Sequence, residues 1–476
     1  MSKPVSSTVD YESVGNDYLA RRSLKRGAAG WMLLATLGVS YVISGDFAGW
    51  NLGLAAGGFG GLLVATLLMG LMYTCMVFAL AELSACLPNA GGGYSFARRA
   101  LGPWGGYITG TAILLEYAIA PAAIVIFIGG YLSSLIGIDG PVVYALFYLA
   151  FIGLHLWGTG EALKILLVIT GIAAVAIVIF VLAMIPYFDV DNLFDIPAGE
   201  GFGASSFLPH GYFGIWACLP FAIWFFLAVE GVPLAAEESR DPGRDMPRGI
   251  IVAMMVLLVF AACVLLLAPG GAGAQLMSES AAPLVDALNA AYGPGNWVAG
   301  LVNVVGLAGL IASFFSIIFG YSRQVFALSR AGYLPRWLSV TNARRAPTLA
   351  LVVPGIIGFL LSLTGQGDLM ITMAVFGATI SYAMMTLSHL LLRSREPDLP
   401  RPYRTPGGRL TSAVALVLAL VAFVSTFLVS LQAALWSAAF YALMLAYFGF
   451  YSRKRLVAQA PEEEFAAIKR AEAELG

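Results

Sequence analysis

Charged residues are scarce in this sequence of 476 residues, since Asp, Glu, Lys and Arg together make up only 11%. A soluble chain carries about 25% charged residues, whereas here 59% are hydrophobic and the mean hydropathy is +0.85. This scarcity excludes an ordinary soluble domain and predicts a chain that crosses the lipid bilayer many times. The net charge of −1 identifies no partner by itself, and we expect no nucleic-acid partner.

Other chemical signatures are also missing. Three of the four cysteines, Cys75, Cys218 and Cys263, fall in apolar runs and Cys86 ends one, so a disulfide framework is not expected. No nucleotide-binding loop, zinc-ligand spacing or Gly-x-Ser-x-Gly elbow occurs, so we predict no ATP-driven pump, enzyme, catalytic residue, metal or cofactor. The N-terminus up to Arg26 is too long and too charged for a cleavable signal peptide.

Long apolar segments, by contrast, follow one another along the chain. A segment of roughly 20 apolar residues is long enough to span a bilayer, and the sequence contains about twelve such segments. The third and eighth are long enough to be tilted. The predicted spans lie near residues 28–56, 60–86, 95–135, 141–157, 163–187, 211–234, 249–269, 296–329, 347–365, 368–393, 410–430 and 432–452.

Basic residues fall in alternate loops. They precede the first span and follow each even-numbered span, whereas the loops near 187–210 and 269–296 carry acids and neither Lys nor Arg. By the positive-inside rule, this alternation predicts a multi-pass protein of the cell (plasma or inner) membrane with both termini in the cytoplasm. We expect disorder in residues 1–20, and disorder or a short helix in residues 461–476.

The first span contains a weak point at mid-depth. Ser44 and Gly45 precede Asp46, and Gly49 follows it. Glycine costs a helix roughly 1 kcal/mol relative to alanine, and a carboxylate at the bilayer centre costs at least ~2.5 kcal/mol. An acid in such a place is functional by default, although it can also pair with a neighbouring helix or cap the second half-helix.

The sixth span contains a second weak point, because Glu230 is followed by Gly231 and Pro233. The first and sixth spans occupy equivalent positions in two halves of five spans each. Paired interruptions at matching positions indicate a transport site between two broken helices. The sequence contains isolated acids rather than a continuous polar stripe, which favours a carrier over a channel. A sensor usually has an extra soluble signalling domain, and we find none in the sequence.

Several stretches resemble the amino acid–polyamine–organocation (APC) family of permeases. They cover about residues 28–410 in the order of the family. The stretches are AELS at 81–84, PNAGGGY at 88–94, AAEE at 235–238, DP at 241–242, SR at 322–323, ALSRAGYLP at 327–335, AP at 346–347 and PDLPRPY at 397–403. The resemblance implies an all-α membrane fold of the leucine-transporter type, with two inverted five-helix repeats, broken helices 1 and 6, two further helices, and secondary transport.

This resemblance divides the chain into five parts. They are a cytoplasmic tail (1–27), a ten-helix transport core (28–393), a cytoplasmic loop (394–409), the eleventh and twelfth helices (410–452) and a C-terminal cytoplasmic tail (453–476). The lipid bilayer is the surrounding partner, and no decisive packing motif predicts an oligomeric state.

One departure from the family concerns the substrate. Amino acid carriers of the family usually have a Gly-Ser-Gly-like break, whose free N–H groups receive the substrate carboxylate. Here the break reads Ile43-Ser44-Gly45-Asp46, and its aspartate repels a carboxylate but attracts an ammonium group. With FAGWN at 47–51 it resembles the ethanolamine permease subgroup, which implies import of a small organic amine near Asp46. An amino acid or polyamine permease or exchanger is the alternative.

Other candidates surround these breaks. Glu230 matches a family glutamate that either bonds the free amides or carries a proton, and Glu116 in the third span is a second candidate for an amine, hydroxyl or proton contact. These two are the candidate coupling or gating residues. Core packing or helix-to-helix hydrogen bonds are the alternatives for the rest. The full set of predicted substrate-binding residues is Ser44, Gly45, Asp46, Glu116, Tyr117, Phe226, Ala228, Val229, Glu230, Ser313 and Ser316.

The coupling mode stays open in the sequence. Some proton-coupled relatives have a lysine deep in the fifth helix, but residues 165–181 contain none, and we expect Lys164 to extend toward the interface. Exchange, proton symport through a carboxylate, and uniport are all compatible with the sequence. We expect Glu82 to pair with an arginine and the histidines His155 and His389 to have packing roles. We expect Arg323 and Arg330 to make contacts near the cytoplasmic gate rather than to bind substrate.

Overall fold

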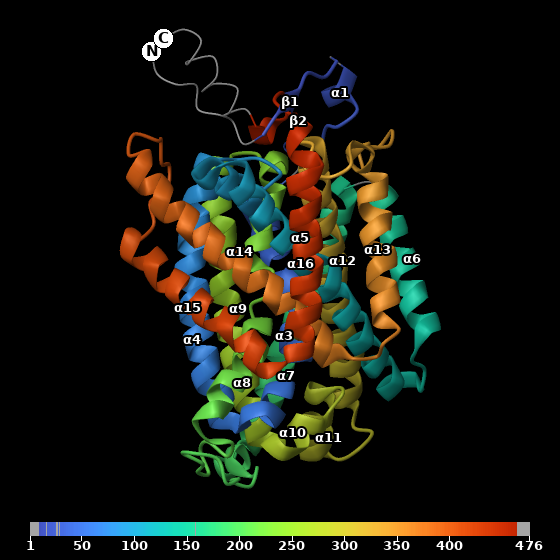
Figure 1. Cartoon of the computed structure of the whole chain (residues 1–476). Helices are drawn as coiled ribbons and strands as arrows, with labels where there is room; N and C mark the ends of the chain where they lie inside the picture. The colour runs from blue at the N-terminus through green and yellow to red at the C-terminus, as the bar shows by residue number, and fades with distance from the viewer. Residues whose placement is uncertain (1–8, 16, 25–26, 28, 158, 464–476) are drawn as a thin grey trace.

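The computed structural model describes residues 9–15, 17–24, 27, 29–157 and 159–463, and they form a bundle of helices (Figure 1). Within these ranges, nine helices are long and apolar enough to cross a membrane, and three shorter apolar helices, Trp31–Phe47, Pro141–Trp157 and Thr348–Ser362, lie among them. Together they match the predicted spans one by one. The predicted fold class, an all-α membrane protein of many spans, is confirmed.

The principal helices follow the predicted order. They are α2 (Trp31–Val42), α3 (Ser44–Phe47), α4 (Leu52–Cys86), α5 (Gly93–Ile136), α6 (Pro141–Trp157), α7 (Thr159–Met184), α8 (Gly211–Trp224), η3 (Val229–Glu238), α9 (Pro242–Ala272), α12 (Trp297–Arg330), α13 (Thr348–Ser362), α14 (Gly367–Arg395), α15 (Arg409–Val429) and α16 (Leu431–Phe450). Short helices are α1 (Asp17–Ala20), η1 (Ile185–Tyr187), η2 (Asp191–Phe194), α10 (Ala274–Glu279), α11 (Pro283–Tyr292), η4 (Arg336–Ser339), η5 (Ser452–Lys454) and η6 (Pro461–Glu463).

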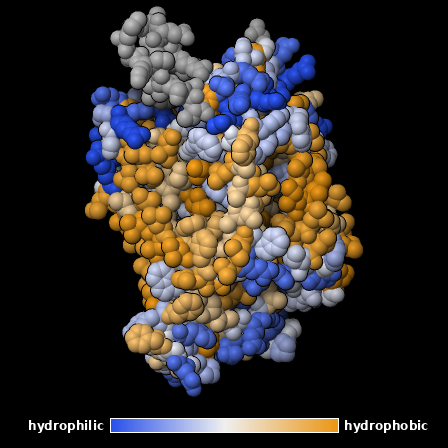
Figure 2. Space-filling model, in the orientation of Figure 1, coloured by the Kyte–Doolittle hydropathy of each residue, from blue (hydrophilic) through white to orange (hydrophobic). Residues whose placement is uncertain are grey.

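The outer surface between the two ends of the bundle is apolar. Figure 2 shows a wide hydrophobic zone between two hydrophilic ends. Large apolar side chains such as Leu67, Leu149 and Leu443 are 66%, 72% and 69% exposed there. Such exposure is unfavourable in water but suits contact with lipid chains, so the zone marks the membrane-facing surface.

The predicted break in the sixth span is present, whereas the first span is interrupted only at Ile43, whose φ of −56° and ψ of −22° stay helical. The first span consists of α2 and the single turn α3, after which Ala48 is extended and Gly49 has a φ of +94°. The predicted span 28–56 therefore ends at Phe47, and α4 begins within it and turns at Gly58, where φ is +70°. In the sixth span, α8 ends at Trp224 and η3 begins after Ala228, which has a left-handed φ of +75°.

The two breaks touch each other at Gly45. A Cβ atom added there would lie 2.4 Å from the backbone oxygen of Trp224. Only glycine lets the two backbones approach this closely, which gives the glycine at this position a packing reason in addition to its low helix propensity.

The end of the bundle that carries β1 and β2 includes both terminal segments. Strand β1 (Tyr11–Glu12) pairs in parallel with β2 (Leu456–Val457), which is ordered structure where we expected disorder in residues 1–20. Residues 464–476, for which we also expected disorder or a helix, lie outside the described residues. The opposite end carries α10 and α11 (Figure 1). We call these the β1–β2 end and the α10–α11 end.

The predicted structural role of Glu82 is confirmed. Its carboxylate accepts hydrogen bonds from Arg393 (Nη2–Oε2, 2.6 Å) and Arg401 (Nε–Oε1, 2.9 Å), which tie the end of α14 and the loop after it to α4. The two histidines also have packing partners: His155 Nε2 lies 2.9 Å from the carbonyl of Phe315, and His389 Nδ1 lies 2.7 Å from Ser412 Oγ.

Candidate functional site

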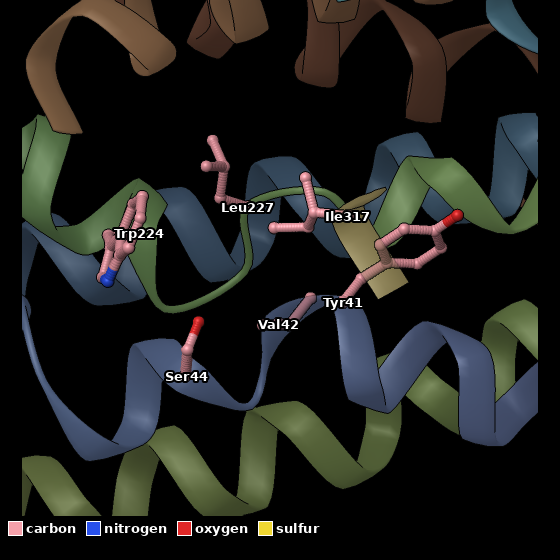
Figure 3. Close-up of a pocket in the computed structure, with 6 residues that line it drawn as sticks. All are labelled: Tyr41, Val42, Ser44, Trp224, Leu227 and Ile317. Carbon is pink, nitrogen blue, oxygen red and sulfur yellow. The ribbon is translucent and has the colours of Figure 1, made fainter. Parts of the chain in front are cut away.

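A narrow cavity lies between the two helix breaks, and each of the side chains that line it is at most 3% exposed. In Figure 3 the first helix contributes one wall, with the hydroxyl of Ser44 directed toward the cavity, while the second break and α12 contribute the other. The lining residues are Tyr41, Val42, Ser44, Trp224, Leu227 and Ile317.

Trp224 joins the two breaks at this cavity. Its indole N–H donates a hydrogen bond to the carbonyl oxygen of Ala48 at 3.0 Å. Gly49 makes room for the ring, because a Cβ atom at this position would lie 2.6 Å from the indole nitrogen. The aromatic wall is thereby fixed by a hydrogen bond to the first helix rather than by packing alone.

Ser313 of α12 holds the first break from another side. Its Oγ accepts a hydrogen bond from the Ser44 N–H (2.9 Å) and donates one to the Ser40 carbonyl (2.7 Å). Ser316, by contrast, bonds the Ala312 carbonyl of its own helix (2.8 Å) and does not line the cavity. The structure therefore brings Ser313 to the break and leaves Ser316 in helix packing.

Several backbone N–H groups of the two breaks already have acceptors. Asp46 N–H donates to the Ile43 carbonyl (3.2 Å), and Gly49 N–H donates to Asn51 Oδ1 (3.1 Å). In the second break, Phe226 N–H donates to the Ile223 carbonyl at 2.8 Å. These amides are not free to receive a carboxylate in this conformation.

Asp46 is completely buried at 0% exposure, and neither of its carboxylate oxygens has a hydrogen-bond partner among the described residues. The turn α3 packs against α9 and α12. Asp46 is not among the residues that line the cavity, although Ser44, two residues earlier, is. The sequence thus predicts the right turn of helix, but the structure places the carboxylate beside the cavity wall rather than in it.

Glu116 and Glu230 meet at a second buried polar group. Tyr117 Oη donates to Glu230 Oε1 (3.0 Å), and Tyr382 Oη donates to Glu116 Oε1 (3.4 Å). Glu116 directly precedes Tyr117 in α5. Tyr73 extends the group, since its hydroxyl donates to Tyr382 Oη at 2.7 Å. The structure therefore brings three of the predicted residues, Glu116, Tyr117 and Glu230, into one cluster.

Stacked aromatic rings connect this cluster with the cavity. The ring of Tyr41, which lines the cavity, stacks on Tyr117 with 6.1 Å between the ring centroids. Next to them, Arg323 donates to Glu238 Oε1 from Nε (3.0 Å) and Nη2 (2.8 Å). The Glu238 carbonyl accepts the N–H of Ala29, just before α2, at 2.9 Å. These contacts close the bundle between α2, η3 and α12.

Arg330 makes a similar contact, with Nη2 bonded 2.6 Å from Glu237 Oε1. Both arginines therefore bind acids at the end of η3 and do not line the cavity, in agreement with the role expected from the sequence.

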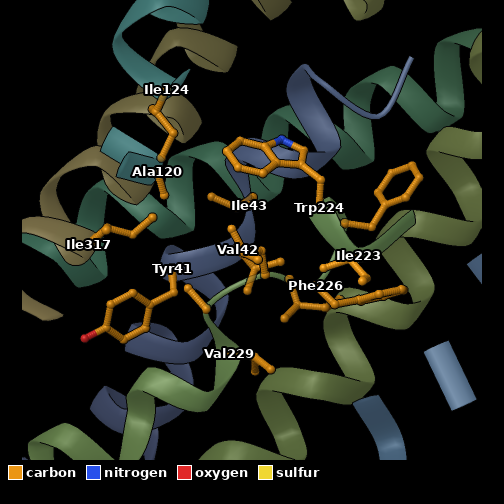
Figure 4. Close-up of a cluster of buried hydrophobic side chains, with 14 of the residues drawn as sticks. Tyr41, Val42, Ile43, Ala120, Ile124, Ile223, Trp224, Phe226, Val229 and Ile317 are labelled. Carbon is orange, nitrogen blue, oxygen red and sulfur yellow. The ribbon is translucent and has the colours of Figure 1, made fainter. Parts of the chain in front are cut away.

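The remaining predicted residues lie near the cavity without lining it. Phe226 packs on Tyr73, with 5.4 Å between the ring centroids, and lines a different apolar cavity of about 420 Å³ between α4 and α9. Val229 belongs to the buried apolar cluster shown in Figure 4. Ala228 provides the left-handed turn, and Leu227 is the residue of this break that reaches the cavity.

The sequence reading missed Tyr41, Val42, Leu227 and Ile317, and it treated Trp224 only as one of several aromatic residues. Tyr41 carried a usable signal, since residues three apart lie on one face of a helix and Tyr41 precedes Ser44 by three positions. Val42, Leu227 and Ile317 gave no such signal, because an apolar residue in a membrane span is equally compatible with a cavity wall, the protein core and contact with lipid.

Within the described residues, nine long and three shorter apolar helices form the bundle, and this architecture is that of a membrane protein of many spans. Comparison with known families identifies which one: the chain matches the amino acid permease family over residues 30–450 and belongs to it. It is 30% identical over 403 residues to an uncharacterized transporter of Rhizobium meliloti (strain 1021), covering 82% of this chain and 85% of that one.

Two relatives from Bacillus subtilis (strain 168) have named substrates. The chain is 24% identical to a branched-chain amino acid permease, covering 84% of this chain and 88% of that one. It is also 25% identical to a methylthioribose transporter, covering 78% and 82%. The substrates in the names of these two relatives are a branched-chain amino acid and methylthioribose.

Proposed function

We propose that this permease is a secondary active transporter that imports a small organic amine cation, with ethanolamine as the first candidate. The ammonium group binds near Asp46, and access alternates by movement of the two broken helices against their surroundings. The observation that carries the proposal is the buried carboxylate of Asp46, which has no partner among the described residues. The basic loops support cytoplasmic termini, and therefore a cytoplasmic β1–β2 end.

The electrostatics of the break favour a cation. When Asp46 is ionised, its charge acts over several ångströms in a medium of low dielectric constant, so it attracts an ammonium in the cavity. The face of Trp224 adds cation–π attraction of about 0.5–2 kcal/mol. The Ser44 hydroxyl offers a hydrogen bond to a hydroxyl group at the other end of the substrate.

An amino acid carrier of the same family is the alternative, and the similarity to the branched-chain amino acid permease favours it. An amino acid substrate needs N–H donors for its carboxylate, and the Ser44 and Asp46 amides already donate within the protein. A polyamine suits several separate acids, so the Glu116–Glu230 cluster keeps this class as a second alternative.

Uptake of labelled ethanolamine into proteoliposomes, with unlabelled choline, alanine, leucine and putrescine as competitors, tests the proposal. We expect saturable uptake that excess ethanolamine abolishes and that alanine and leucine leave unchanged. Preferential competition by alanine or leucine would establish the amino acid alternative, and preferential competition by putrescine would establish the polyamine alternative.

A further inference from the structure

The larger apolar cavity, between α4 and α9, opens on the membrane-facing surface. Its volume of about 420 Å³ lies within the range of about 300–1,000 Å³ that is usual for small-molecule pockets. Three leucines that line it, Leu67, Leu71 and Leu266, are 66%, 50% and 40% exposed. Exposed leucines on a membrane protein contact lipid chains, so the mouth of this cavity faces the interior of the bilayer.

The cavity also reaches deep into the protein. Phe226, Ala261 and Leu265 line it, and each is only 1% exposed. Gly70 of α4 keeps the approach to Phe226 open, because a Cβ atom added to this glycine would lie 3.8 Å from the end of the phenylalanine ring. A molecule that enters from the membrane surface can therefore come into contact with Phe226.

The lining selects an apolar occupant. Among the described residues, no charged side chain lines the cavity, and threonines are its only polar members. The Thr74 hydroxyl donates to the Gly70 carbonyl at 2.7 Å, and Thr66, which is 8% exposed, has no hydrogen-bond partner in the described part of the chain. One free hydroxyl is too little to hold a phosphate headgroup, which needs several donors or a positive charge.

The volume favours a thin occupant over a protein helix. A helix is about 10–12 Å wide with its side chains and rises about 5.4 Å per turn, so one turn would take up the whole cavity. A helix of a second copy could cover the mouth without reaching Phe226. An extended hydrocarbon chain, which the bilayer supplies at the mouth, is narrow enough to reach it.

The second helix break separates this cavity from the substrate cavity. Trp224 and Leu227 line the substrate cavity, whereas Phe226, between them in sequence, lines the cavity between α4 and α9. The Phe226 ring packs on Tyr73, with 5.4 Å between the ring centroids, and its N–H donates to the Ile223 carbonyl at 2.8 Å. A molecule in contact with the Phe226 ring therefore acts on the same short stretch of backbone that positions Trp224 and Leu227.

We propose that the cavity between α4 and α9 binds one acyl chain of a membrane lipid, and that this chain supports the second break from the membrane side. The chain enters between Leu67 and Leu266, and its end contacts Phe226. The headgroup of the same lipid stays at the bilayer surface. This role is independent of the proposed substrate, because it concerns the position of the break and not the molecule that is carried.

Photolabelling of the full chain in nanodiscs tests the site. The probe is a phosphatidylcholine with a diazirine near the end of one acyl chain, and peptide mass spectrometry locates the adducts after illumination. We expect adducts at Phe226 and Ala261, which a lipid that stays on the surface does not reach. Adducts confined to exposed residues such as Leu149 and Leu443 would overturn the proposed site.

Two tryptophan variants test the route. Ala262 is an exposed residue of the cavity lining, so the indole of Ala262→Trp should fill the cavity and abolish the Phe226 adduct while labelling of Leu443 persists. Ala439→Trp is the matched control, because Ala439 is an exposed alanine of α16 that does not line this cavity, and it should keep the Phe226 adduct. An undiminished Phe226 adduct in Ala262→Trp would show that the chain does not enter here.

Hydrogen exchange across residues 225–229 tests the link to the break. We compare nanodiscs of straight-chain phosphatidylcholine with nanodiscs of a methyl-branched one, whose chains are too wide for the cavity. Exchange in the wild type should be several-fold faster with branched chains, whereas Ala262→Trp should exchange alike in both, because its indole takes the place of the chain. Equal exchange of the wild type in both lipids would contradict support of the break by the chain.

The outcome is separate from that of the transport experiments. Neither measurement uses ethanolamine, so a chain that carries another substrate gives the same labelling and the same exchange. Labelling of the wild type needs no mutation and decides the site even if Ala262→Trp does not fold. If a second copy covers the mouth instead of lipid, the wild type will show no adduct at Phe226, which counts against the proposal.

Discussion

Trp224 donates its indole N–H to the carbonyl oxygen of Ala48, so a side chain at the end of α8 is bonded to the backbone of the first helix break. This single contact links the two interrupted helices at the wall of the cavity. It implies that the breaks move as a connected unit, because opening one without the other leaves a buried carbonyl without a donor.

Replacing Trp224 by phenylalanine keeps an aromatic wall but removes this hydrogen bond. A net hydrogen bond contributes about 0.5–1.5 kcal/mol, so we expect the apparent affinity for substrate to fall roughly 2- to 12-fold. Trp216→Phe is the matched control, because Trp216 lies on the same helix and is 38% exposed, away from the cavity. Equal affinities of the two variants in uptake assays would show that the Trp224 bond has no role in binding.

Gly45→Ala tests the close approach of the two breaks. The added Cβ atom would meet the Trp224 carbonyl at 2.4 Å, a backbone atom that moves only if the breaks separate. Overpacking of this kind costs about 1–3 kcal/mol, so we expect a lower melting temperature in detergent and slower uptake.

Gly300→Ala is the control for that variant, since Gly300 lies in α12 and has nothing within 4 Å of its added Cβ atom. Alanine there should be neutral or stabilising by up to about 1 kcal/mol. If Gly45→Ala melts and transports like the wild type, the two breaks do not depend on this contact.

Glu463 joins the C-terminal segment to the β1–β2 end. Its buried carboxylate accepts hydrogen bonds from Arg98 Nε (2.8 Å), Tyr11 (3.0 Å) and Tyr333 (3.0 Å). Glu463→Ala leaves Arg98, itself only 8% exposed, without its acid. Breaking a buried ion pair costs about 3–5 kcal/mol, so hydrogen exchange across Leu456–Val457 should accelerate at least 100-fold.

The exposed pair of Glu12 and Arg336, with an oxygen–nitrogen distance of 2.9 Å, is the matched comparison at the same end. An exposed ion pair contributes about 0–1 kcal/mol, so Glu12→Ala should change exchange across the same strand by less than about 10-fold. Similar acceleration in both variants would mean that Glu463 does not anchor the segment.

Much of this arrangement was predictable from the sequence. Scarce charge and repeated apolar segments predicted the helical spans, and glycine and proline beside an acid predicted the break in the sixth span. The side-chain directions at the breaks were not predictable. One residue turns a helix by about 100°, and an interrupted helix loses the regular phase that would show which of Ser44 and Asp46 lines the cavity.

The terminal contacts were missed for a different reason. A strand of two residues, such as Tyr11–Glu12, has no periodic pattern to detect, and its partner lies more than 400 residues away in a charged segment. The ion pair between Glu463 and Arg98 could likewise not be predicted from the sequence, because only the folded chain brings the C-terminal segment next to α5.

The most direct test of the central claim is ethanolamine binding to the purified wild type and to Asp46→Asn, measured by calorimetry at equal pH. Asparagine keeps the size of the side chain but removes its charge, so we expect affinity to fall at least 100-fold while the melting temperature stays near that of the wild type. Unchanged ethanolamine affinity in Asp46→Asn would contradict the account, because the charge of Asp46 would then have no part in selecting a cation.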